Sequence, residues 1–195
     1  IVFGDWSSDV CSSDLYQGEV LLISTHQHPR TLYPGTCYID EIGSGTQKGK
    51  IMNVTFAPGS GQVSVEKAFR DIINPVLTEF KPEFILCSAG FDAHHEDPLT
   101  NMGFQDQTYG WMLQEIIKAA EINAKGRIQC TLEGGYNLNA IGNSISNVIN
   151  VLAGGSMPFT DDEFDEDKNV TDFTENKLIP ELKKLFTPFW SSIKG

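Results

Sequence analysis

The stretch FILCSAGFDAHHEDPL, residues 84–99, joins a short apolar run to a loop rich in histidine and carboxylate. Three similar apolar runs occur elsewhere, each bounded by turn residues: Val20–Ser24, Ile51–Phe56 and Ile128–Leu132. Strands that are apolar at consecutive positions are buried on both faces, as in a parallel sheet. Apolar residues at helical spacing lie between these runs, over 65–80, 109–120 and 141–152, and Pro75 predicts a kink in the first of these helices. The alternation predicts an α/β fold with a mainly parallel sheet.

The composition is that of a globular protein, because 40% of the 195 residues are hydrophobic and 21% are charged. The net charge of −12 argues against direct binding to nucleic acid, which depends on clusters of lysine and arginine. No apolar run approaches the roughly 18–20 residues that span a bilayer, so we expect no membrane partner. The start of the chain shows no secretory signal, and the cysteines form no CxxC pair. We therefore expect reduced thiols and a cytoplasmic location.

The loops that follow three of the predicted strands contain all four histidines of the chain. They cover Thr25–Thr36, Ala89–Leu99 and Glu133–Leu138. In a parallel sheet the carboxyl ends of the strands share one edge, and ligands bind outside that edge. We expect the functional site where these loops meet.

The second of these loops places carboxylates and imidazoles together, at Asp92, His94, His95 and Asp97. Such a set suits Zn²⁺, and a zinc site with an open position would be catalytic. The alternative is structural: the carboxylates cap turns, and the histidines are exposed or hydrogen-bond to neighbours. The residue types alone leave both open.

The other two loops carry weaker signals. Gly134 and Gly135 allow a close approach of backbone to a ligand, and Tyr136 could donate a hydrogen bond to an oxyanion. The alternative is an ordinary Gly-Gly turn, with the tyrosine packed on the following helix. His26 and His28, two residues apart, would lie on one side of an extended segment, although exposed loop histidines are more often without a ligand.

Four motifs together resemble the histone deacetylase superfamily, in its class II-like and bacterial branch with acetoin-utilisation and acetylpolyamine amidohydrolase relatives. They are ISTHQHPRTLYPGT (23–36), GKIMNVTFAPGSG (49–61), SAGFDAHHEDPL (88–99) and LEGGYNL (132–138). The resemblance runs from Tyr16 to Gly155. It implies an arginase/deacetylase-like three-layer fold, a zinc site at the strand ends, and hydrolysis of an acetyl-amide in a protein lysine or a polyamine.

The resemblance also implies roles for individual residues. Tyr136 corresponds to the catalytic tyrosine and Asp92 to a metal-binding carboxylate. Tyr33, Leu99, Gly134 and Gly135 correspond to substrate-binding positions, and Ser24 to a serine that helps to hold a structural potassium ion. His94 and Asp97 correspond to residues that surround the site without binding the metal.

The chain departs from the family pattern near its start. The resemblance places a further metal-binding Asp and His in a D-x-H element ahead of the strand at 20–24, and a His-His base pair farther upstream. Here that region is Ile1–Leu15, which contains DWSSDVCSSDL (Asp5–Leu15). On its residues this string is a flexible loop, and it also looks like the translated sequence of a sequencing-library adapter. One of three expected zinc ligands is therefore present, and no general base.

Three parts are expected along the chain. Residues 1–15 are an artefact or a remnant of a missing N-terminal half, and residues 16–155 are the C-terminal part of a deacetylase domain. Residues 156–195 are an acidic linker, richest in carboxylates over 161–175, followed by a helix around Glu181–Phe186. We expect the full-length parent to be a zinc-dependent deacetylase and this fragment to be inactive alone. The alternative is a non-catalytic truncated relative that acts as a binding module.

Overall fold

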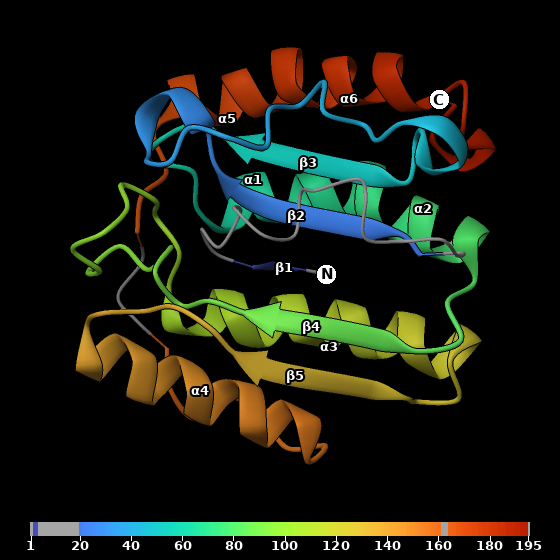
Figure 1. The fold of residues 1–195 in the computed structure, drawn as a ribbon. Helices are drawn as coiled ribbons and strands as arrows, with labels where there is room; N and C mark the ends of the chain where they lie inside the picture. Colours follow the sequence, from blue (N-terminus) through green and yellow to red (C-terminus); the bar gives the residue numbers. More distant parts are fainter. Residues whose placement is uncertain (1, 4–19, 161–163, 195) are drawn as a thin grey trace.

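A parallel five-stranded sheet forms the centre of the described chain (Figure 1). The structure is a computed structural model, and it describes residues 2–3, 20–160 and 164–194. The strands are β1 (Val2–Phe3), β2 (Leu22–Gln27), β3 (Ile51–Phe56), β4 (Ile85–Ala89) and β5 (Ile128–Leu132), in the order β3-β2-β1-β4-β5. Every strand pair is parallel, which confirms the predicted fold class. The string Asp5–Leu15 lies outside the described residues.

The second strand lies farther along the chain than its apolar residues predict. It begins at Leu22 and ends at Gln27, because all six of its residues pair with β3, from Leu22 with Ile51 to Gln27 with Phe56. The polar residues Thr25, His26 and Gln27 are all buried in it. The apolar residues alone predict a strand that ends too early, because the buried part of β2 includes polar side chains whose hydrogen bonds are made inside the fold.

The helices of the middle region follow the predicted apolar spacing. The first comprises α1 (Gln62–Ala68), a π-helical segment (Phe69–Ile73) and α2 (Asn74–Phe80). Pro75 lies in the first turn of α2, directly after the π-helical segment, where its missing N–H is tolerated. The others are α3 (Asp106–Asn123) and α4 (Leu138–Leu152). Figure 1 shows α1, α2 and α3 behind the sheet and α4 beside β5.

The C-terminal segment is more helical than predicted. Asp167 caps α5 (Lys168–Phe173), which lies inside the stretch expected to be a linker and continues through a π-helical segment (Thr174–Leu178) into α6 (Ile179–Phe186). Asp165, Asp167, Asp172 and Glu175 are exposed, and Glu166 accepts hydrogen bonds from the backbone N–H and the hydroxyl of Ser64. Leu178, Leu182 and Phe186 are buried in the main core. The Trp190 indole N–H also donates to the carbonyl of Gly49 over 2.8 Å. This segment is therefore part of the core and not an appendage.

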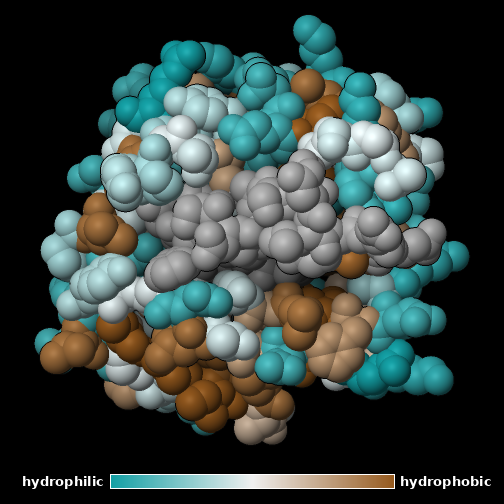
Figure 2. Space-filling view, viewed as in Figure 1, coloured by the Kyte–Doolittle hydropathy of each residue, from teal (hydrophilic) through white to brown (hydrophobic). Residues whose placement is uncertain are grey.

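Apolar side chains remain exposed on β4 and β5. Leu86 is 63% exposed and Leu132 is 60% exposed, whereas Ile85 and Cys87 on the opposite side of β4 are buried. Figure 2 shows hydrophobic surface across the lower part of the molecule, where β4, β5 and α4 lie. Among the described residues β5 is also an edge strand, so within them this border of the sheet is unpaired beside an apolar surface.

Two further expectations bear on partners and thiols. Within residues 2–3, 20–160 and 164–194, no helix is long and apolar enough to cross a membrane. Cys87 and Cys130 are free thiols, as expected. Cys37 is disulfide-bonded, so the expectation of reduced thiols was wrong at that position.

Candidate functional site

The loops that follow β2, β4 and β5 meet at one edge of the sheet, on the left in Figure 1. Gln27, the last residue of β2, accepts a hydrogen bond through Oε1 from the backbone N–H of Asn101, at 2.7 Å. The same side chain donates to Thr31 in its own loop. The backbone N–H of Phe91, after β4, donates over 2.9 Å to the carbonyl of Gly134, after β5. These bonds confirm that the three loops come together.

Asp92 lies at the centre of this edge and is only 1% exposed. Its backbone carbonyl accepts from Thr100 Oγ1 at 2.7 Å, and the preceding carbonyl, of Phe91, accepts from the Tyr109 hydroxyl at 3.0 Å. A Cβ atom at Gly134 would lie 3.4 Å from Asp92 Oδ2. The absence of a side chain at Gly134 therefore leaves the backbone of the β5 loop close to this carboxylate.

Asp97 ties the β5 loop to the β4 loop. Its Oδ2 accepts from the backbone N–H groups of Tyr136 at 2.6 Å and Asn137 at 3.1 Å, and its Oδ1 accepts from Leu99 at 2.9 Å. Hydrogen bonds to an ionised acceptor are stronger than neutral ones. One buried carboxylate thus sets the position of the tyrosine backbone relative to the Asp92 loop.

His94 faces away from this edge and into the fold. It is buried, its Nδ1 accepts from the backbone N–H of Glu96 at 3.1 Å, and its Nε2 lies 3.4 Å from Asp106 Oδ1. Asp106, at the start of α3, also accepts from Asn143 and Ser144 of α4, each at 3.0 Å. An imidazole held in this way anchors the Asp92 loop to two helices. The role of His94 around a metal site stays a prediction.

Ser24 and His26 form a second buried pair, in β2. The Ser24 hydroxyl lies 2.9 Å from His26 Nδ1, and His26 Nε2 lies 3.1 Å from the carbonyl of Cys37. The carbonyl can only accept, so Nε2 carries the proton and the serine donates to Nδ1. Burial lowers the pKa of His26 to about 4, which keeps the ring neutral near pH 7. His26 is a structural residue of a strand and not an exposed loop histidine; the potassium role of Ser24 stays a prediction.

The three side chains expected to contact substrate lie at the surface, whereas Gly134 is buried. Tyr33 is 89% exposed, Tyr136 56% and Leu99 44%. Gly135 has a φ of +129°, and a Cβ atom there would lie 2.9 Å from Ile141 Cγ1, so a glycine is required in this turn.

The described residues do not by themselves form a zinc site. Outside 1, 4–19, 161–163 and 195, no group of three or more His, Cys, Asp or Glu side chains is placed to hold a metal. Catalytic zinc has three protein ligands, and Asp92 supplies one. The D-x-H element expected within Ile1–Leu15 falls outside the described residues except at Val2 and Phe3.

Three residues of this edge were missed as contributors to the site, namely Gln27, Asn101 and Asp106. Each makes a hydrogen bond across a large distance in sequence, and nothing local in the sequence marks such a partner. At Gln27 the available signal was its place in the polar segment that follows the apolar run Val20–Ser24.

Comparison with known proteins gives a consistent result. Residues 4–152 match the family model described as histone deacetylase domain. A probable deacetylase of Archaeoglobus fulgidus is 40% identical over 135 residues, which cover 69% of this chain and 36% of that protein. Histone deacetylase 14, chloroplastic, of Arabidopsis thaliana is 37% identical over 151 residues, covering 77% and 34%. The chain thus spans about a third of the length of these curated relatives.

Solved structures show the same fold. The crystal structure of the HDA15 HD domain superposes with a TM-score of 0.81 at 29% identity, covering 98% of this chain and 51% of that one. The structure of the histone deacetylase Clr3 gives a TM-score of 0.79 at 24% identity, which supports the fold alone.

Proposed function

Since this chain belongs to the histone deacetylase family, we propose that it is the C-terminal part of a zinc-dependent enzyme that hydrolyses an acetyl-amide. The substrate is an acetylated lysine of a protein or an acetylpolyamine. Acetylpolyamines and the lysine-rich segments that surround an acetylated lysine are both cationic, which the net charge of −12 favours electrostatically. A cytoplasmic location and a structural potassium ion near Ser24 belong to the same proposal.

The observation that carries the proposal is the bond between the Asp97 carboxylate and the backbone of Tyr136. It sets a half-exposed phenol beside the loop of a buried carboxylate, Asp92, at the edge where ligands bind in parallel α/β sheets. Amide hydrolysis needs a fixed donor for the oxyanion that forms when water attacks the carbonyl. In this proposal the Tyr136 hydroxyl is that donor, and Leu99 and Tyr33 contact the acyl chain.

Asp92 is the metal ligand that this chain contributes, and the other ligands come from upstream sequence. We expect the 195-residue chain to show no turnover of an acetyl-lysine peptide or of an acetylpolyamine. Turnover by this chain would contradict the fragment part of the proposal. A non-catalytic binding module, the alternative, would remain inactive even when the chain is extended to the length of its relatives.

The test uses the protein restored to the length of its relatives. Tyr136→Phe should lower kcat by about 10²–10³-fold with little change in KM, because the hydroxyl acts mainly in the transition state. The matched control is Tyr38→Phe, which removes a hydroxyl outside the β4 and β5 loops, keeps the ring that packs against His28, and should leave kcat unchanged. Equal losses in kcat for the two variants, or a loss confined to KM, would contradict the assigned role.

A further inference from the structure

Two free cysteines face each other across neighbouring strands. Cys87 of β4 and Cys130 of β5 are direct partners in the strand register. Neighbouring strands lie about 4.8 Å apart, within the range of Cα separations that a disulfide can bridge. Their side chains point to the same side of the sheet, so the two sulfur atoms can meet without a shift of the backbone.

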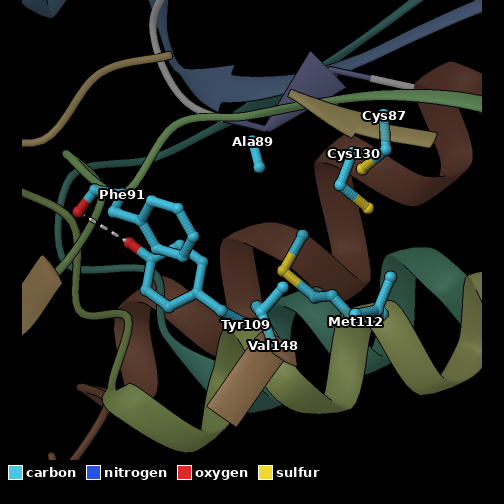
Figure 3. Close-up of a pocket in the computed structure, with 8 residues that line it drawn as sticks. Cys87, Ala89, Phe91, Tyr109, Met112, Cys130 and Val148 are labelled. Carbon is cyan, nitrogen blue, oxygen red and sulfur yellow. Dashed lines mark hydrogen bonds between the residues drawn. The ribbon is translucent and has the colours of Figure 1, made fainter. Parts of the chain in front are cut away.

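Both thiols open into one small apolar pocket behind the candidate site. It is lined by Phe91 and by Tyr109 and Met112 of α3, among others. Figure 3 shows the sulfur atoms of Cys87 and Cys130 beside each other, above the side chain of Met112. Cys87 is 3% exposed, whereas Cys130 is only partly buried. A small oxidant therefore reaches Cys130 more readily than Cys87.

The interaction between the thiols makes them chemically unequal. A hydrogen bond from the Cys87 thiol lowers the pKa of Cys130. The same bond, together with burial, raises the pKa of Cys87 well above its usual value. The thiolate is the form that attacks peroxides and disulfides, so Cys130 is the nucleophile of the pair and Cys87 supplies a proton.

We propose that Cys130 and Cys87 form a peroxide-reactive dithiol, in which Cys130 is oxidised first and Cys87 resolves it to a disulfide. The Cys130 thiolate attacks one oxygen of a hydroperoxide, the O–O bond breaks, and the products are a Cys130 sulfenic acid and, after protonation, water or an alcohol. The Cys87 sulfur then attacks the sulfenic sulfur, the S–O bond breaks, and the Cys87 proton leaves with the hydroxyl group as water. The two sulfurs are oxidised by two electrons together, and the hydroperoxide is reduced.

The position of the pair connects it to the candidate site. β4 leads into Asp92 five residues after Cys87, and β5 leads into Gly134 four residues after Cys130. A disulfide would join covalently the two strands whose ends carry these loops. The inference itself does not rest on the proposed function, because it concerns only the reactivity of two thiols.

The experiment treats the reduced 195-residue chain with hydrogen peroxide and follows tryptic peptides by mass spectrometry. We expect a disulfide that links the peptide of Cys87 to the peptide that begins at Ile128. In Cys87→Ser, Cys130 should stop at the sulfenic acid and be trapped by dimedone. In Cys130→Ser, Cys87 should be oxidised more slowly than Cys130 is in the unchanged chain, because Cys87 is buried and Cys130 is only partly buried. Cys37→Ser is the matched control and should still form the linked peptides.

A second measurement needs no variant and so does not depend on whether a variant folds. Iodoacetamide added to the reduced native chain should label Cys130 at least about tenfold faster than Cys87. The difference should disappear in concentrated urea. Equal labelling rates in the native chain, or a peroxide product without linked Cys87 and Cys130 peptides, would overturn the proposal.

Discussion

Removing the Asp97 carboxylate is the sharpest test of how the candidate site is held together. Asp97 is 5% exposed and accepts hydrogen bonds from the backbone N–H groups of Leu99, Tyr136 and Asn137. Asp97→Ala removes all three acceptor contacts. Asp97→Asn keeps the size of the side chain but loses the charge and turns one acceptor end into a donor.

The magnitude follows from these three bonds. A hydrogen bond to a charged group contributes about 1.5–3 kcal/mol to stability. Because Leu99 and Tyr136 lie at the surface, water replaces part of what they lose, and the three losses are not additive. We expect Asp97→Ala to lower the free energy of unfolding by about 3 kcal/mol and Asp97→Asn by about 2 kcal/mol. For a chain of this length, about 3 kcal/mol corresponds to a fall in Tm of roughly 6–12 °C.

The assay combines thermal unfolding with amide hydrogen exchange. Exchange at Tyr136 and Asn137 should accelerate by about 10²-fold in Asp97→Ala, since 1.4 kcal/mol is a factor of ten in an equilibrium constant. The control is Asp40→Asn, which removes a charge from an exposed loop position. If Asp97→Ala lost less than about 1 kcal/mol, or matched Asp40→Asn, the carboxylate would not be what holds the β5 loop.

Three further perturbations test other parts of the structure. Gly135→Ala should destabilise the fold by about 1–3 kcal/mol, because its φ of +129° and its contact with the next helix exclude a side chain. The control Gly142→Ala, at an open position of α4, should be neutral or stabilising. Equal Tm values for the two variants would contradict this prediction. Burial lowers the pKa of His26 from 6.5 to about 4. Between these two pH values the unfolded chain therefore binds a proton that the folded chain does not. The free energy of unfolding, highest above pH 6.5, should fall by about 3 kcal/mol as the pH drops toward 4. His26→Gln should flatten that part of the profile in urea titrations, and an unchanged slope would refute the linkage. Finally, the chain should bind a hydrophobic dye through its exposed apolar surface, and Leu86→Glu should reduce the dye fluorescence; undiminished fluorescence would show that the dye binds elsewhere.

Two strands could be predicted to the residue, whereas the run expected as a strand over 84–88 forms β4 at Ile85–Ala89. Ile51–Phe56 and Ile128–Leu132 begin and end where the apolar runs do. β2 could not, because its second half is polar and buried. The side chains of Ser24 and His26 hydrogen-bond to each other within β2. The hydrophobicity pattern of the sequence does not indicate this hydrogen bond.

The start of α5 shows the opposite limitation. Carboxylates dominate 161–175, and a high density of like charge predicts a solvated linker. The helix nevertheless begins at Lys168, and Asp167 caps its start. In the π-helical segment that follows, Thr174 and Leu178 are buried against the core. Packing of that face outweighs the charge on the other, and single-sequence reading underestimates such tertiary support.

The meeting of the three loops was predictable from topology, while the bonds that fix them were not. Parallel strands bring Asp92 and Tyr136 to one edge whatever their separation in sequence. The loops are held by hydrogen bonds that side chains accept from backbone N–H groups: Asp97 accepts from Tyr136 in the β5 loop, and Gln27 accepts from Asn101. Their partners are backbone groups, which every residue possesses, so the sequence cannot identify them.

Hydrogen bonds within the described chain hold the Asp92 loop from three directions. Asp97 joins it to the β5 loop, Gln27 joins it to β2, and Asp106 holds His94 from the start of α3. These contacts involve no residue of the region where the resemblance places the D-x-H element. In the sheet beneath this edge, however, β1 (Val2–Phe3) belongs to that region and pairs with both β2 and β4. Because the three contacts themselves lie within residues 27–137, the effect of Asp97→Ala on stability can be measured on this chain alone.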